Sequence, residues 1–165
     1  MPIDTHVKRG HPITFGLLIL FSFIEMVQTA VLTSSFNRNG APSSSINDKV
    51  RFLLFTSIWT LLFSIVYLAG FMSSPGSFLF SIASHAVWLF LTWVFWLAGA
   101  AAITAALGGG LDCGDISIGS CHQLNSAEAF GWINWILITF AFVTIVIVGA
   151  RSARRGDGFG SGLTA

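Results

Sequence analysis

Four long runs of mostly apolar residues determine what this chain can fold into. A helix needs roughly 20 such residues to cross the roughly 30 Å of hydrocarbon in a bilayer. The runs cover residues 12–33, 50–72, 78–107 and 127–149. Membrane-spanning β-strands would instead alternate in polarity over about ten residues, a pattern that the sequence lacks. The sequence therefore predicts an all-α integral membrane protein, built as a bundle of four transmembrane helices with short connections.

The composition excludes the main soluble classes. Of the 165 residues, 54% are hydrophobic and only 9% are charged, whereas about 25% are charged in a typical globular protein. So few charges cannot provide a solvated surface for a chain of this length. Eight basic and seven acidic residues give a net charge of +1. This is not the excess of basic residues that binds the phosphates of a nucleic acid. We expect neither a soluble enzyme nor a disordered chain nor a nucleic-acid partner.

The apolar runs leave only short segments outside the membrane. We predict a cytosolic N-terminal arm over residues 1–11, a four-span membrane domain over residues 12–149, and a flexible cytosolic tail over residues 150–165. All four prolines lie outside the runs or at their edges, where the missing backbone N–H does not interrupt a helix. The first run is not expected to be a cleaved signal, because it exceeds the usual 7–15 apolar residues and contains Glu25.

The distribution of basic residues predicts the orientation in the membrane. With four spans, both termini lie on the same side. The arm and the tail carry five basic residues, while the connection over residues 34–49 and its helix edge carry three. Cytosolic segments of membrane proteins are enriched in Lys and Arg. We therefore expect the N and C termini to be cytosolic.

Both cysteines of the chain, Cys113 and Cys121, lie in the connection over residues 108–126. The predicted orientation places this connection outside the cytosol, where disulfides persist. We therefore predict a Cys113–Cys121 disulfide that closes a short ring, with two free thiols as the alternative. Although His122 and acidic residues lie nearby, they show no recognised spacing of zinc ligands. No metal site and no cofactor are predicted.

A polar stripe follows one face of the first span. Ser22, Glu25, Gln28 and Thr29 succeed one another at helical spacing, so they share a face. Glu25 is the acidic residue deep in this span, and a buried carboxylate costs several kcal/mol. Its side chain should therefore face the bundle interior or stay protonated.

The depth of Glu25 limits its expected partners. Glu25 lies about 20 Å along its span, and Thr92, Trp93 and Thr60 of the neighbouring spans reach a similar depth. One interpretation is a carboxylate that couples protons or ions, and the other is a neutral acid that locks helix packing through hydrogen bonds. We favour packing, because His85 is the one other ionisable group available and lies only about 10 Å along its own span. His85 itself is expected to be neutral and hydrogen-bonded.

The third span combines large aromatic residues with small ones. Trp93 and Trp96 are followed by Ala98, Gly99 and Ala102. Small residues at a spacing of four allow another helix backbone to approach closely. We predict that this face packs within the bundle, with an oligomer interface as the alternative.

No catalytic arrangement is present in the sequence. It contains no HExxH motif, no GxSxG motif and no paired-carboxylate motif. We therefore predict no catalytic residues and a protein that is not an enzyme.

Several of these features together resemble the MARVEL domain, and small fungal proteins of that type in particular. The best local match is the run WVFWLA over residues 93–98. It is followed by Cys113, Cys121 and the run AEAFGW over residues 127–132 at the entry to the last span. The resemblance covers about residues 10–150.

The resemblance implies a role in membrane organisation. Proteins of this family are associated with membrane apposition, sterol- and sphingolipid-rich domains, vesicle traffic and, in fungi, subdomains of the plasma membrane. It implies lateral association with membrane lipids, with further copies as a homo-oligomer or with other membrane proteins, in the plasma membrane or in secretory or endosomal membranes. The alternatives are a small transporter or channel component that uses Glu25 and His85, and an accessory subunit of a membrane complex.

Overall fold

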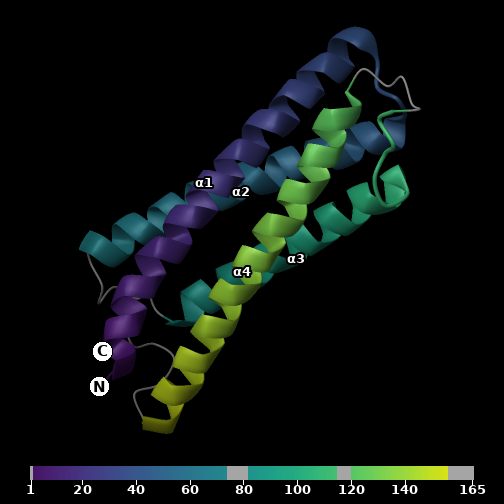
Figure 1. Ribbon diagram of the computed structural model, residues 1–165. Coiled ribbons are helices and arrows are strands. Elements are labelled where there is room, and N and C mark those ends of the chain that lie inside the picture. The colour runs from purple at the N-terminus through teal and green to yellow at the C-terminus, as the bar shows by residue number, and fades with distance from the viewer. Residues whose placement is uncertain (1, 74–81, 115–119, 156–165) are drawn as a thin grey trace.

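The computed structural model describes residues 2–73, 82–114 and 120–155 (Figure 1). These residues form four helices, α1 (Pro2–Asn39), α2 (Ser44–Ser73), α3 (Ile82–Leu107) and α4 (Cys121–Arg155). In length and apolar composition, four segments can each cross a membrane: Pro12–Asn39, Ser44–Gly70, Ala83–Leu107 and Cys121–Arg151. Helices are the only regular elements in the described part of the chain, so the predicted all-α fold with four spans is confirmed.

The four helices form a ring in which sequence neighbours pack side by side. Helix α1 packs against α2 and α4, and α3 packs against the same two helices. The start of α1, the end of α2, the start of α3 and the end of α4 lie at one end of the bundle, here called the terminal end (Figure 1). The opposite end, here called the loop end, carries the connections from α1 to α2 and from α3 to α4.

The first two helices extend further toward the loop end than expected, because the residues that end α1 and cap α2 lie outside the apolar runs. α1 passes the predicted limit of 12–33 and stops at Gly40, whose φ of 83° favours glycine. The Gly40 N–H donates to the carbonyl of Phe36 at 3.0 Å, which satisfies one of the last free carbonyls of the helix. α2 begins after Ser43, whose hydroxyl caps the N–H of Ile46 at 3.2 Å.

The connection from α3 to α4 begins with a glycine turn. α3 ends before Gly108, which has a φ of 70°, and the Gly109 N–H donates to the carbonyl of Thr104 at 3.0 Å. This is the Schellman arrangement, in which glycine takes the left-handed conformation at the end of a helix. α4 then begins at Cys121, six residues before the predicted start at 127, and the expected start of the third span at 78 lies outside the described residues.

The predicted arm and tail are helical where the structure describes them. α1 begins at Pro2 and continues through Pro12, so residues 2–11 do not form a separate arm. A proline in the first turn costs nothing, and one inside a helix removes a single backbone donor without ending it here. α4 continues to Arg155, and the rest of the predicted tail over 150–165 lies outside the described residues.

The bundle interior has three layers along its length. Nine of the ten buried polar side chains in the described part of the chain form a polar middle layer, consisting of Ser22, Glu25, Thr29, Thr56, Ser57, Thr60, Ser64, Thr92 and Asn134. The terminal-end apolar layer consists mainly of Phe15, Leu18, Tyr67, Trp88, Leu89, Ile138, Ala141 and Ile145. The loop-end apolar layer consists mainly of Leu32, Phe36, Val50, Leu53, Ile103, Leu107, Leu124 and Ala127. All of these buried polar side chains except His85 therefore lie at mid-depth, between two mainly apolar layers.

The outer surface of the bundle is apolar. Large hydrophobic side chains point outward from all four helices, and Ile13, Val87 and Phe140 are each more than 60% exposed. In water such a surface would aggregate, but in a bilayer it is the surface that lipid chains cover.

Candidate functional site

Four hydrogen bonds between tryptophan and threonine side chains hold the helices together. The indole N–H of Trp59 donates to Thr92 at 3.1 Å, and that of Trp96 donates to Thr60 at 2.9 Å. The other two pairs join α3 to α4, from Trp93 to Thr139 at 2.9 Å and from Trp132 to Thr104 at 3.0 Å. Each pair has one member on α3, so this helix connects α2 with α4.

The local geometry of each threonine explains why it accepts these bonds. The hydroxyls of Thr60, Thr92 and Thr139 each donate to the carbonyl four residues earlier in their own helix, at 2.8 Å in all three cases. A hydroxyl whose proton is already used has free lone pairs, and an indole N–H can only donate. Thr104 instead donates to Glu128 Oε1 at 2.7 Å, so a half-buried carboxyl joins this network.

Glu25 lies fully buried in the polar middle layer, and neither of its carboxyl oxygens has a hydrogen-bond partner. The expected bonds to Thr60, Thr92 and Trp93 do not form, because these three side chains bond to tryptophan or threonine on α2, α3 and α4. The prediction of these partners was wrong. Gln28, one turn away, is partly buried, and its Oε1 also has no partner.

Helix α1 is connected to α4 at the depth of the polar middle layer. The Ser22 hydroxyl donates to Asn134 Oδ1 at 3.2 Å, and Asn134 Nδ2 donates to the Phe130 carbonyl at 2.9 Å. Asn134 was not singled out from the sequence, although its position between apolar residues one turn away on either side was a signal that it lies inside the bundle.

His85 is fully buried, but in the terminal-end apolar layer and not with Glu25. Its ring centroid lies 4.3 Å from that of Tyr67 and 6.2 Å from that of Phe15. The Tyr67 hydroxyl lies 2.7 Å from Ser84 Oγ, next to His85 in the chain. Helix α3 thus presents His85 to an aromatic cluster, apart from the polar middle layer.

The small residues of α3 do not all pack as expected. Gly99 is buried, and a Cβ atom built there would lie 2.8 Å from Leu53 Cδ2 of α2. Ala98 is exposed and Ala102 is half-buried. The close approach of helices therefore occurs at Gly99, because rotation of α3 about its axis turns Ala98 toward the outer surface.

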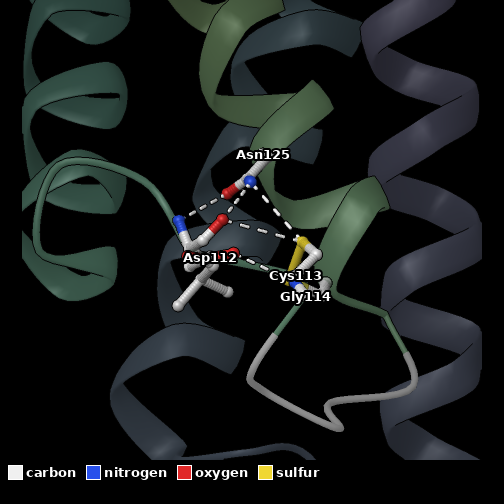
Figure 2. Close-up of a disulfide and its surroundings, with 6 residues drawn as sticks. Asp112, Cys113, Gly114 and Asn125 are labelled. Atoms are coloured by element: carbon white, nitrogen blue, oxygen red, sulfur yellow. Dashed lines mark hydrogen bonds between the residues drawn. A yellow bond between two sulfur atoms is a disulfide. The ribbon is translucent and has the colours of Figure 1, made fainter.

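The disulfide pins the connection to the start of α4. Cys113 is bonded to Cys121, with their Cα atoms 5.7 Å apart. Figure 2 shows the Asn125 side chain reaching from α4 to the same connection. It donates to the Leu111 carbonyl at 2.8 Å and accepts from the Leu111 N–H at 2.9 Å, and the Gly114 N–H donates to the Asp112 carboxyl at 3.0 Å.

Neither the disulfide region nor the bundle interior offers a metal centre among the described residues. No three His, Cys, Asp or Glu side chains of this part of the chain lie together in a way that could hold a metal ion.

Comparison with known proteins agrees with the bundle of four apolar helices. The family model MARVEL, described as a membrane-associating domain, matches residues 7–144, which is most of the chain. No curated protein and no solved structure matches it. This chain therefore belongs to the MARVEL family of membrane-associating domains and is a multi-pass membrane protein with four spans.

Proposed function

We propose that this protein organises membrane subdomains or membrane traffic by associating laterally with lipids, with other membrane proteins and with further copies of itself. It carries out no catalysis in this proposal. The support is that hydrogen bonds from tryptophan to threonine and from Ser22 to Asn134 join the helices inside the bundle, while apolar side chains form the outer surface. Recognition then takes place on that outer surface, within the bilayer.

The observation that carries the proposal is the layered interior. A transport pathway needs polar groups at successive depths from one side of the membrane to the other. Here fully buried apolar side chains such as Leu18 and Leu32 lie on both sides of Glu25 along α1, and fully buried Val50 and Leu53 close the polar section of α2 toward the loop end. This arrangement supports a membrane organiser in preference to a transporter or channel component.

The outer face of α3 is the favoured surface for self-association. Ala98, Ala101 and Ala105 are exposed on it at helical spacing, and small residues let helices approach closely in lipid. The family resemblance favours sterols or sphingolipids as the lipid partners, and the plasma membrane or the secretory and endosomal membranes as the location.

A reconstitution experiment tests the proposal. The purified protein is placed in giant vesicles that separate into a sterol- and sphingolipid-rich phase and a fluid phase, and its distribution and oligomeric state are measured by fluorescence. We expect enrichment in one phase and self-association that Ala101→Phe weakens. Phe140→Leu on the exposed face of α4 is the matched control and should have no effect.

Two results would contradict the proposal. One is a monomer that distributes evenly between the phases and co-purifies with no specific lipid. The other is proton flux into liposomes that Glu25→Gln abolishes while the fold is retained, which would favour the transporter.

A further inference from the structure

Three oxygen atoms on one face of α1 have no hydrogen-bond donor. They are both carboxyl oxygens of Glu25 and Oε1 of Gln28, all buried inside the structure. Residues three apart on a helix are neighbours on its surface, so these two side chains can reach each other. A buried polar atom without a hydrogen bond lowers the stability of a protein. Three such acceptors close together indicate a position that a hydrogen-bond donor would stabilise.

The neighbouring hydroxyl groups do not supply this donor, and the side-chain amide of Gln28 does not donate to Glu25 either. The Ser22 hydroxyl donates to Asn134, and the Thr29 hydroxyl donates at 2.7 Å to the backbone carbonyl of Glu25. Across the interface, the hydroxyls of Thr60 and Thr92 donate within their own helices. The hydroxyls of Thr56 and Ser64 have no partner either, and neither bonds to Glu25.

No cation of the described chain balances a charge on Glu25. Arg38 in the last turn of α1 and the described basic side chains of α2, Lys49 and Arg51, lie at the loop end, where Arg51 donates to Asn37 at 2.8 Å. Those of α4, Arg151 and Arg154, lie at the terminal end. On α3 the described titratable group is His85, in the terminal-end apolar layer.

The acidic side chains described on α2 and α4 also lie outside the polar middle layer. Asp48 lies near the start of α2, and Glu128 of α4 accepts from Thr104 at the loop-end side of the bundle. An ionised Glu25 would therefore be a single uncompensated charge in a low-dielectric interior, the most costly way to bury a carboxyl group.

We propose that Glu25 and Gln28 form a proton-binding site enclosed at mid-depth in the bundle. Glu25 binds one proton from solvent on a carboxylate oxygen, which converts the anion to the neutral acid. The new O–H donates to Oε1 of Gln28, and the other carboxyl oxygen remains a carbonyl. The single proton satisfies Gln28 and removes the charge, and it does not depend on the lateral association proposed above.

Enclosure is part of the site. Leu18 and Phe15 close it toward the terminal end of α1, and Leu32 and Phe36 close it toward the loop end, with all four buried. These four apolar side chains separate the site from both ends of α1.

Carbon-13 labelling gives a direct test, because Glu25 and Glu128 are the only two glutamates of the chain. The protein is produced with ¹³C-labelled glutamate, placed in lipid nanodiscs at neutral pH and examined by infrared spectroscopy. We expect an isotope-shifted carbonyl band of a protonated carboxylic acid, which Glu128→Gln retains and Glu25→Gln removes. In Gln28→Leu the band should remain but change frequency, because the acid loses its acceptor.

Other results would overturn the proposal. The first is that wild-type protein shows only carboxylate bands, which means that Glu25 is ionised. The second is that Glu128→Gln, and not Glu25→Gln, removes the acid band. The third is a stoichiometric sodium, potassium or calcium ion, found by elemental analysis and lost in Glu25→Gln. The wild-type and Glu128→Gln spectra decide the question even where Glu25→Gln fails to fold.

Discussion

The side chain of Glu25 determines how substitutions at the centre of α1 should rank. Glu25→Gln keeps the size and polarity of the side chain, so it should leave stability nearly unchanged. Glu25→Leu should cost less than about 0.6 kcal/mol, the average for an interhelical hydrogen bond in a membrane, because Glu25 makes no hydrogen bond to another helix. Glu25→Lys should be the most destabilising, because it buries a cation with no matching acid in the described interior.

The midpoint temperature of thermal unfolding in detergent, measured at equal protein concentration for each variant, tests this ranking. Exposed Val27→Gln on the same helix serves as a control for adding an amide to α1. If Glu25→Lys were as stable as Glu25→Gln, the interior position of this side chain would be wrong.

The bond between Trp96 and Thr60 permits a second measurement on single side chains. Trp96 is fully buried and its indole donates to Thr60. A double-mutant cycle with Trp96→Phe and Thr60→Val should give a coupling energy of about 0.6 kcal/mol and at most about 1.7 kcal/mol. The free energy of unfolding in mixed micelles provides the values.

The matched control for this cycle is Thr144→Val. The Thr144 hydroxyl bonds only to the Phe140 carbonyl of its own helix and is exposed. It should show no coupling to Trp96→Phe, whereas an equal coupling would mean that the cycle reports general loosening of the bundle.

The sequence predicted which side chains lie inside but not which of them meet. The helical spacing of Ser22, Glu25 and Thr29 was enough to place them on one buried face. Their partners depend on the rotation and relative height of four helices, and a shift of one turn exchanges one acceptor for another. For that reason the Trp59–Thr92 and Ser22–Asn134 bonds could not be found from the spacing within one helix.

Because α3 packs closely against α2, its adjacent residues Gly99 and Ala98 differ in whether they leave space for a larger side chain. Gly99→Leu should destabilise the bundle by about 1–3 kcal/mol, because its side chain overlaps Leu53 of α2. Ala98→Leu adds the same side chain one residue away, on the exposed face, and should leave the stability of the single bundle nearly unchanged in lipid. Equilibrium unfolding of both variants checks the pair.

A compensating change strengthens this comparison. Leu53→Ala in the Gly99→Leu background should restore part of the lost stability, since it removes the atom nearest to the new side chain. Equal effects of Gly99→Leu and Ala98→Leu would contradict the observed rotation of α3.

The connection between α3 and α4 depends on its disulfide. In the chain-entropy description, a ring of this size contributes about 2–3 kcal/mol, so the Cys113→Ser, Cys121→Ser double variant should unfold at a lower temperature. Intact-mass analysis of non-reduced protein should show the loss of two hydrogens. Two thiols that react with an alkylating reagent in protein from its native membrane would contradict the bond.

Helix limits were predictable only where the sequence carries an explicit signal. Gly40 and Gly108 mark the ends of α1 and α3, and both take left-handed conformations. The polar ends of the helices, such as residues 34–39, do not look membrane-embedded by composition, yet they contain no proline or glycine to stop the helix. Hydrophobicity locates a span, and backbone chemistry decides where its helix stops.

For the molecule in its membrane, the unequal distribution of Arg and Lys predicts the orientation. In a Cys113→Ser, Cys121→Ser background, single cysteines are introduced as Thr5→Cys, Ser44→Cys and Ser161→Cys. An impermeant thiol reagent added to intact cells should label only Ser44→Cys, because the termini are expected to be cytosolic. Permeabilised cells, in which all three sites react, provide the control, and outside labelling of Thr5→Cys would reverse the orientation.

The fold class was the most predictable property of the molecule, and the layered interior the least. Length and apolar composition already require four spans, because no other structure satisfies so many backbone groups in lipid. That nine buried polar side chains gather at mid-depth follows from how four separate sequences align in space. The sequence of a single helix does not predict this layer, since α4, for example, contributes only Asn134 to it.

The position of α3 between its two partners has a consequence for biogenesis. Spans leave the ribosome in order, so α1, α2 and α3 reach the membrane before α4 has been made. The indoles of Trp59 and Trp96 can already pair across α2 and α3, but that of Trp93 has no acceptor until Thr139 arrives. A nascent chain that stalls after its third span therefore leaves the Trp93 indole N–H without the acceptor that it has in the complete bundle.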